Sequence, residues 1–250
     1  MSARVLYLLT LFLSCAYVTP AWAQKPREPQ SLLLEAIKAQ GGEENLAKTL
    51  LMTRKATGVM SFFGRDLPFS DELVVQLPDR WRWTLEGAMP GQNVRVMVIV
   101  NGTRGWQSNG GPALELTKER LDELREETYL IWLASLVPLL KEKGLELETL
   151  PDAQVNGQAA AVLKVSSKGH TDVKLFFEKQ SRLLVKAEHR AREAGQPVDK
   201  EYFYAAHKAV EGVLLPTKYM EFTNGKKLVE VSSITYKFHR AVDERTFVKP

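Results

Sequence analysis

A tight hairpin near the middle of the chain constrains what this sequence can fold into. Asn156-Gly157 supplies the two residues of positive φ that a type I′ turn requires. After this turn, apolar residues alternate with others over residues 161–165, 173–177 and 183–187, which is the period of two typical of half-buried strands. These segments predict an antiparallel meander with one apolar face and one charged face. Such a sheet needs a cover over its apolar face.

The first 23 residues have the features of an export signal. Arg4 provides a positive start, residues 5–14 are apolar, and Ala21-Trp22-Ala23 is a small-x-small cleavage motif. The apolar stretch leads into cleavage-site residues rather than a basic flank, which argues against a transmembrane anchor. We therefore expect a bacterial periplasmic protein that is cleaved after Ala23. The minority alternative is a lipid anchor on Cys15, because residues 12–15 faintly resemble a lipobox.

Composition limits the remaining chain to one ordinary globular domain. Cys15 is the only cysteine, so residues 24–250 must be stable through burial alone, without disulfides. The 34 Lys and Arg residues barely exceed the 30 Asp and Glu residues, and they are dispersed. This balance argues against a nucleic-acid partner but is compatible with contact with an anionic membrane surface. We expect a monomer.

Strand patterns dominate the rest of the sequence. A first helix, capped by Ser31, should end at Gly41-Gly42. In the last strand the inward parity changes at Ser232-Ser233, which predicts a β-bulge. About ten strands and few helices indicate a mainly β (α+β) domain, a curved antiparallel sheet with a helical insertion on its concave face. Besides the meander, strands are expected at residues 55–63, 73–77, 81–85, 94–101, 201–206, 217–222 and 227–238.

The helical insertion is predicted at about residues 112–143. Its first half is heavily charged, whereas residues 129–140 carry no charge and include Pro138. Twelve uncharged residues are too few to span a bilayer. We therefore expect either a lid that occupies the cavity until a ligand displaces it, or a permanently docked core helix.

Several short motifs resemble the LolA/LolB-like envelope proteins, the carriers and receptors of outer-membrane lipoprotein sorting. The motifs are Pro-Asp-Arg-Trp-Arg at 78–82, Val-Asn-Gly-Thr-Arg-Gly-Trp at 100–106, Lys-Gly-x-x-Asp-Val-x-Leu-x-Phe at 168–177, Leu-Leu-Val-Lys-x-Glu at 183–188 and Phe-x-Lys-Pro at 247–250. The resemblance implies an incomplete, half-open β-barrel covered by helices, whose concavity accepts acyl chains. The motifs do not place the carrier's functional arginine or the receptor's anchoring cysteine, so both roles stay open.

The sequence offers little for catalysis. Its four histidines, His170, His189, His207 and His239, lie on separate segments without metal-ligand spacing. We predict no enzyme activity, metal or cofactor. The leading hypothesis is a periplasmic binding protein for acyl chains, lipids or lipoproteins, as a carrier between envelope membranes. The alternative is a partner-binding or sensing module of the same fold with a filled core.

Candidate ligand-binding residues are the inward positions of the strands and of the lid helix. They are Val75, Trp81, Trp83, Val96, Val98, Trp132, Leu133, Leu136, Leu163, Val165, Leu175 and Phe177.

Two adjacent aromatic residues form a second candidate site. Phe62 and Phe63 approach a Gly-Arg-Asp turn, and adjacent strand residues point to opposite faces, so one ring should be exposed. The functional interpretation is transient membrane contact. The alternative is that both rings pack under residues 67–69.

Overall fold

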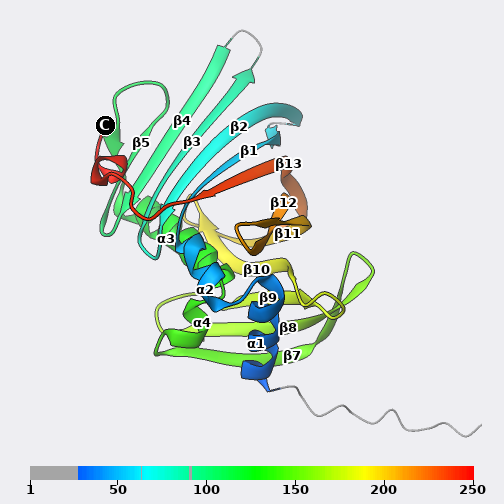
Figure 1. Cartoon of the computed structure of the whole chain (residues 1–250). Helices are drawn as coiled ribbons and strands as arrows, with labels where there is room; N and C mark the ends of the chain where they lie inside the picture. The colour runs from blue at the N-terminus through cyan, green and yellow to red at the C-terminus, as the bar shows by residue number, and fades with distance from the viewer. Residues whose placement is uncertain (1–27, 63, 90–91) are drawn as a thin grey trace, which may run out of the picture.

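A single antiparallel sheet carries the whole structure. The computed structural model describes residues 28–250 except 63, 90 and 91, and its thirteen strands follow the order β6-β5-β4-β3-β2-β1-β13-β12-β11-β10-β9-β8-β7. The two edge strands, β6 and β7, do not pair with each other, so the sheet stays open (Figure 1). The strands are β1 Leu51–Phe62, β2 Arg65–Gln76, β3 Arg80–Met89, β4 Gln92–Asn101, β5 Arg104–Ser108, β6 Leu114–Glu115, β7 Leu145–Val155, β8 Gln158–Ser167, β9 Val173–Glu178, β10 Leu184–Glu193, β11 Gln196–Val210, β12 Val213–Thr223 and β13 Lys226–Phe238.

The turn and bulge signals of the sequence are confirmed. Asn156 and Gly157 have φ values of 50° and 79° and connect β7 to β8, as a type I′ turn requires. Between β1 and β13 the register moves from Thr57↔Ser233 to Gly58↔Val231, which leaves one extra residue in β13. Gly58 is needed opposite this bulge, because a Cβ there would lie 2.2 Å from the Glu230 carbonyl oxygen.

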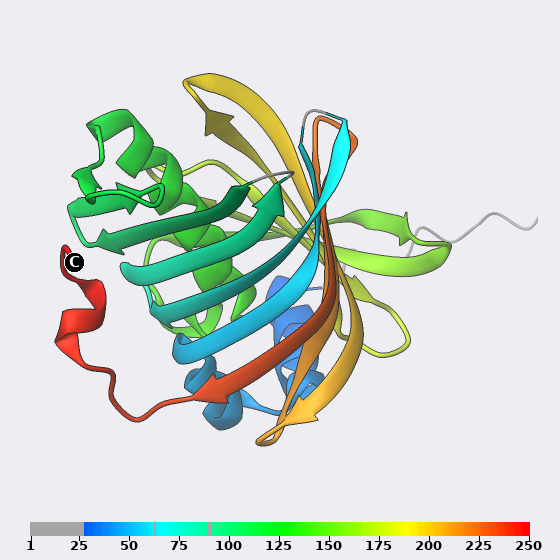
Figure 2. The same cartoon turned by 90° about the horizontal axis from the view of Figure 1, so that it is seen from above.

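The sheet curves around the helices, as Figure 2 shows from above. Helix α3 (Lys118–Ala134) contributes to core clusters on both halves of the sheet, whereas α1 (Pro29–Gln40) and α4 (Pro138–Lys141) contribute only to the cluster over β8, β9 and β10. The short helices α2 (Glu43–Leu46) and η1 (Ala47–Leu50) lead from α1 into β1. On the convex face, Phe247 of η2 (Glu244–Phe247) packs with Trp106 and Ile99. No helix among the described residues is long and apolar enough to cross a membrane.

The helices differ from the sequence prediction at their ends. Helix α1 begins at Pro29 with Glu28 before it, so Ser31 lies inside the helix and does not cap it. The insertion begins with a strand, β6, and α3 starts only at Lys118, where the Thr117 hydroxyl accepts a hydrogen bond from the Arg120 amide at 3.3 Å. Leu136, with φ of 65°, separates α3 from α4.

The structure also has more strands than the sequence predicts, thirteen rather than about ten. The pattern of residues 65–72, which includes Pro68 and four acidic or basic side chains, hides the first half of β2 in the sequence. Strand β6 has only two residues, too few for a periodicity.

Candidate functional site: an amphipathic cavity

A cavity of about 550 Å³ lies between α3 and the concave face of the sheet. Its walls come mainly from β1, β2 and β3 on one side and from β11, β12 and β13 on the other. The apolar residues of these walls include Met52, Met60, Phe69, Leu73, Trp81, Trp83, Val98, Leu215, Leu228, Val229 and Ile234. A volume of this size is typical of sites for small ligands, which are mostly apolar with few polar groups.

One face of α3 forms the cover of this cavity. Leu124, Thr128, Ile131 and Ser135 follow one another at spacings of four, three and four residues and all line the cavity, so they lie on one side of the helix. Thr128 and Ser135 are small, and each hydroxyl donates a hydrogen bond to a backbone carbonyl one turn earlier, at 2.8 and 2.6 Å. Small side chains on this face leave the space unfilled.

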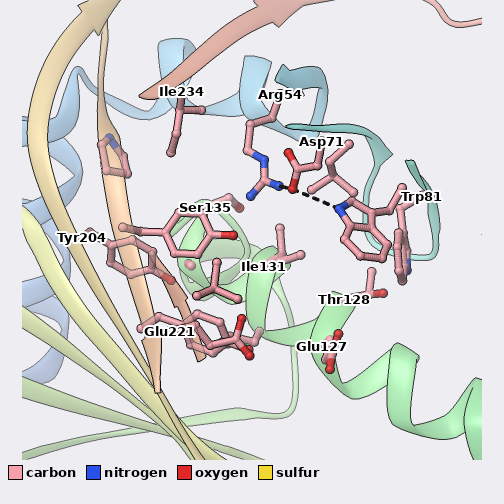
Figure 3. Close-up of a pocket in the computed structure, with 18 of the residues that line it drawn as sticks. Arg54, Asp71, Trp81, Glu127, Thr128, Ile131, Ser135, Tyr204, Glu221 and Ile234 are labelled. Carbon is pink, nitrogen blue, oxygen red and sulfur yellow. Dashed lines mark hydrogen bonds and ion pairs between the residues drawn. The ribbon is translucent and has the colours of Figure 1, made fainter. Parts of the chain in front are cut away.

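A buried ion pair forms part of the cavity wall (Figure 3). Nη2 of Arg54 donates to Oδ2 of Asp71 at 2.5 Å, and Nε1 of Trp83 donates to the same oxygen at 3.0 Å. The Arg54 guanidinium also lies 5.6 Å from the centre of the Tyr219 ring. Burial opposes the charge of Arg54, but attraction to Tyr219 and Asp71 outweighs it and raises its pKa. Arg54 Nε and Asp71 Oδ1 have no hydrogen-bond partner among the described residues.

A second charged group, Lys200, lies in the cavity wall with 4 % of its surface exposed. Its ammonium contacts Glu127 of α3 at 3.3 Å, Glu193 of β10 at 2.7 Å and Glu221 of β12 at 3.0 Å. Burial alone would lower the pKa of Lys200, but Glu127 and Glu221 raise it overall. Burial raises the pKa of Glu221 despite the nearby ammonium. We call these four residues the Lys200 cluster.

Four tyrosines complete the polar part of the wall: Tyr202, Tyr204, Tyr219 and Tyr236. Burial raises the pKa of the Tyr204 and Tyr236 hydroxyls well above their ordinary value, so both are neutral at pH 7. The Tyr236 hydroxyl donates to the carbonyl of Pro216 at 2.6 Å. The cavity is therefore amphipathic, with hydrogen-bonding groups set among rings and aliphatic side chains.

The predicted ligand-binding residues divide among three places. Trp81, Trp83 and Val98 line the cavity. Val75 and Val96 pack in the adjoining cluster with Trp81 and do not line it. The other seven lie in or against the core cluster under α1 and the end of α3, and none lines the cavity: Trp132, Leu133, Leu136, Leu163, Val165, Leu175 and Phe177. There the helices fill the concave face, because Leu32, Leu33, Leu133 and Leu136 have no exposed surface.

Sequence reasoning missed the charged members of the site. Arg54 shares its parity with Met52 and Ala56, and Lys200 shares its parity with Val198 and Tyr202. Charged residues at inward positions of an alternating strand were a usable signal, because an inward charge needs a partner or a ligand.

The predicted membrane-contact pair cannot be placed as a pair. Phe63 lies outside the described residues, and for Phe62 only the backbone at the end of β1 is described.

In the part of the chain that the structure describes, no group of three or more His, Cys, Asp or Glu side chains could hold a metal ion.

Comparison with known proteins supports the fold. No protein-family model matches the sequence, and no curated protein matches it either. Among solved structures, a LolA superfamily protein from Nitrosomonas europaea has a TM-score of 0.53 at 12% identity, covering 89% of this chain and 98% of that one. A DUF1329 family protein from Desulfovibrio piger has a TM-score of 0.56 at 11% identity, covering 89% and 98%. A putative outer membrane lipoprotein-sorting protein domain from Vibrio parahaemolyticus has a TM-score of 0.51 at 14% identity, covering 84% and 97%. The chain therefore has a LolA-like fold.

Proposed function

We propose that this protein is a non-enzymatic periplasmic binding protein for acyl chains, lipids or lipoproteins, and that the cavity under α3 is its binding site. The observation that carries the proposal is the cavity itself, about 550 Å³ with mostly apolar and aromatic walls. The lipoprotein-sorting domain among the proteins of similar fold supports a lipid-related role. A carrier between envelope membranes is the role that fits best with an exported protein of this kind.

The energetics of acyl-chain transfer support a partly polar site. Burial of an acyl chain gives about 0.8 kcal/mol per CH₂, so a ~14-carbon chain at full strength would gain roughly 11 kcal/mol. A carrier that bound so tightly would release its cargo slowly. Polar groups such as Arg54, Asp71 and Tyr204 lower the gain, because they make the wall less apolar than a lipid environment.

Helix α3 is better suited to a fixed cover than to a lid that leaves the sheet. The cavity is present with α3 docked, and Leu133, near the end of the helix, has no exposed surface. At the other half of the helix, Glu123 accepts a hydrogen bond from the Gly195 amide at 2.9 Å, and Glu127 contacts Lys200.

The direct experiment is native mass spectrometry on protein purified from the periplasm without detergent, followed by binding of a fluorescent acyl probe. Co-purified lipid and saturable probe binding are expected. Ile131→Trp should fill the cavity and abolish probe binding, whereas the control Leu114→Trp, at a residue 72% exposed on β6, should leave it unchanged. Thermal unfolding checks that both variants fold. Wild-type protein that carries no lipid and binds no probe would refute the proposal.

A second candidate is an envelope partner-binding or sensing module. The filled half of the concave face favours it, since a packed core there leaves no room for a ligand. The convex face also has a polar groove of about 430 Å³. Its lining includes the cationic residues Lys55, Arg82 and Arg95 and the acidic residues Glu72 and Glu86. Proteins crosslinked in the periplasm at Arg82, without bound lipid, would support this candidate.

A further inference from the structure

The charges of the cavity wall are not balanced. The ionisable residues that line it include three cations, Arg54, Arg120 and Lys200. They also include four carboxylates: Asp71, Glu127, Glu193 and Glu221. The imidazole of His207 adds no positive charge, because burial lowers its pKa. The cavity therefore carries an excess of negative charge near neutral pH.

This excess is concentrated at the Lys200 cluster. One ammonium there faces three carboxylates that come from three separate elements, α3, β10 and β12. Two negative charges stay uncompensated within the cluster. Arg120, which also lines the cavity, does not reduce the excess, because its guanidinium contacts Glu123 at 3.0 Å.

A second, separate observation points to a missing hydrogen-bond donor. The Asp71 side chain is only 3% exposed and lines the same cavity, yet its Oδ1 has no partner among the described residues. A buried acceptor without a donor is costly. A hydrogen-bond donor on a ligand that lies beside Asp71 would satisfy it.

The uncharged part of the wall also suits a cation. The rings of Trp83, Tyr202, Tyr204 and Tyr219 line the cavity beside these carboxylates, and aromatic faces attract cations. In Figure 3, Glu127 and Glu221 lie on the side of the cavity opposite Ile234. A head group near Glu221 would therefore leave its chain directed toward the apolar residues of β13, such as Val229 and Ile234.

We propose that the cavity selects amphiphiles whose head group carries an ammonium, with the ammonium held by the Lys200 cluster and the chain among the apolar residues of β1 and β13. This proposal rests on the proposed function. Nε of Arg54 has no partner among the described residues and could donate to a ligand acceptor. An anionic head group nevertheless fits less well, because the charges of Arg54 and Arg120 are already paired with carboxylates and the net charge of the wall is negative. A zwitterionic lipid with an ammonium group belongs to the proposed class.

The test compares three probes of equal chain length on the full mature protein: dodecylamine, which is protonated at pH 7, dodecanol and dodecanoate. Dissociation constants are measured by titration calorimetry below the concentration at which each probe forms micelles. Dodecylamine is expected to bind about tenfold or more tightly than either other probe, the discrimination typical of a charged hydrogen bond.

Substitutions of single carboxylates test which residues bind the ammonium of dodecylamine. Glu221→Gln should weaken dodecylamine binding by about tenfold and leave dodecanol binding unchanged. Glu193→Gln, at a side chain that is 37% exposed and so easily tolerated, should act in the same direction. The matched control is Glu201→Gln, on the opposite face of β11, where Glu201 contacts Lys186 at 2.6 Å; it should change neither affinity.

The outcomes separate this inference from the proposed function. Equal binding of all three probes, or dodecylamine binding that neither glutamine variant weakens, overturns the ammonium site while the lipid-binding function stands. Binding of none of the three probes refutes both.

Discussion

The two halves of the concave face are built from the same kind of strand, yet one is filled by packed side chains and the other encloses a cavity. We call them the packed half and the hollow half. In the packed half, formed by β7, β8, β9 and the neighbouring helices, inward residues such as Leu163, Leu175 and Phe177 have no exposed surface. In the hollow half, inward positions hold Arg54 and Tyr204, and the cover is a single helix face with small residues. The comparison teaches that alternation defines an inward face, whereas the covering helices decide whether that face becomes a core or a cavity.

The largest difference between the halves should appear when large side chains are truncated. Phe177→Ala in the packed half should lower the free energy of unfolding by about 3–5 kcal/mol, because it opens a void among well-packed neighbours. Ile131→Ala should cost about 1 kcal/mol or less, since its side chain already borders empty space. Chemical denaturation measures both. Similar losses would mean that the hollow half is packed as tightly as the other.

The second largest effect on stability is expected when one charge of the buried Arg54–Asp71 pair is removed. Asp71→Asn leaves the Arg54 guanidinium without its counter-ion in a largely buried site, and we expect a loss of about 3 kcal/mol in unfolding free energy. The matched control is Glu72→Gln, which breaks the exposed pair with Lys55 on the other face of the same two strands. That change should have an effect within about 0.5 kcal/mol. Equal effects would show that the Arg54 pair is not buried.

Acid should destabilise the sheet beside the cavity through His189. Burial and the nearby Lys200 lower the pKa of His189 to about 4. Between pH 6.5 and 4 the unfolded state takes up a proton that the folded state does not, so stability falls by roughly 3 kcal/mol as the pH drops through this window. The raised pKa of Glu221 acts in the opposite direction.

The contribution of His189 is separated by substitution. His189→Gln should show a smaller loss of unfolding free energy between pH 7 and 4 than the unsubstituted protein, with denaturation curves at each pH as the measurement. Identical pH dependence in both proteins would mean that His189 takes up its proton in the folded state.

The smallest effect on stability is expected for a substitution of His170, in the loop after β8 that contacts α3. His170 Nδ1 lies 2.8 Å from Glu126 Oε1, and its ring stacks on Tyr129 with centroids 3.8 Å apart. Because His170 and Glu126 are partly exposed, His170→Ala should reduce the unfolding free energy by only about 1 kcal/mol. Acyl-probe affinity should stay unchanged if α3 is a fixed cover. A clear gain in affinity would support a lid that opens.

Much of the fold could be predicted because its signals are local. The Asn156-Gly157 turn and the bulge at Ser232 follow from a dipeptide and from a change of parity, and Trp81 and Trp83 face the cavity side as alternation requires. The position of the cavity is not a local property. Leu163 and Trp83 have the same kind of strand pattern, and only the packing of α1 over Leu163 separates core from cavity wall.

The most direct test of the hollow half uses its own tryptophans. Of the five in the sequence, Trp22 lies in the predicted signal, which leaves four. In two variants of the chain from Gln24 onward, either Trp83 or Trp106 is kept and the other tryptophans become Phe. Trp83 lines the cavity, whereas Trp106 packs on the convex face with Phe247.

An acyl chain carrying bromine atoms quenches tryptophan fluorescence only at close range. The account predicts saturable quenching of the Trp83 variant and little quenching of the Trp106 variant. Equal quenching of both variants, or saturable binding that leaves Trp83 unquenched, would contradict the claim that the hollow half holds the ligand.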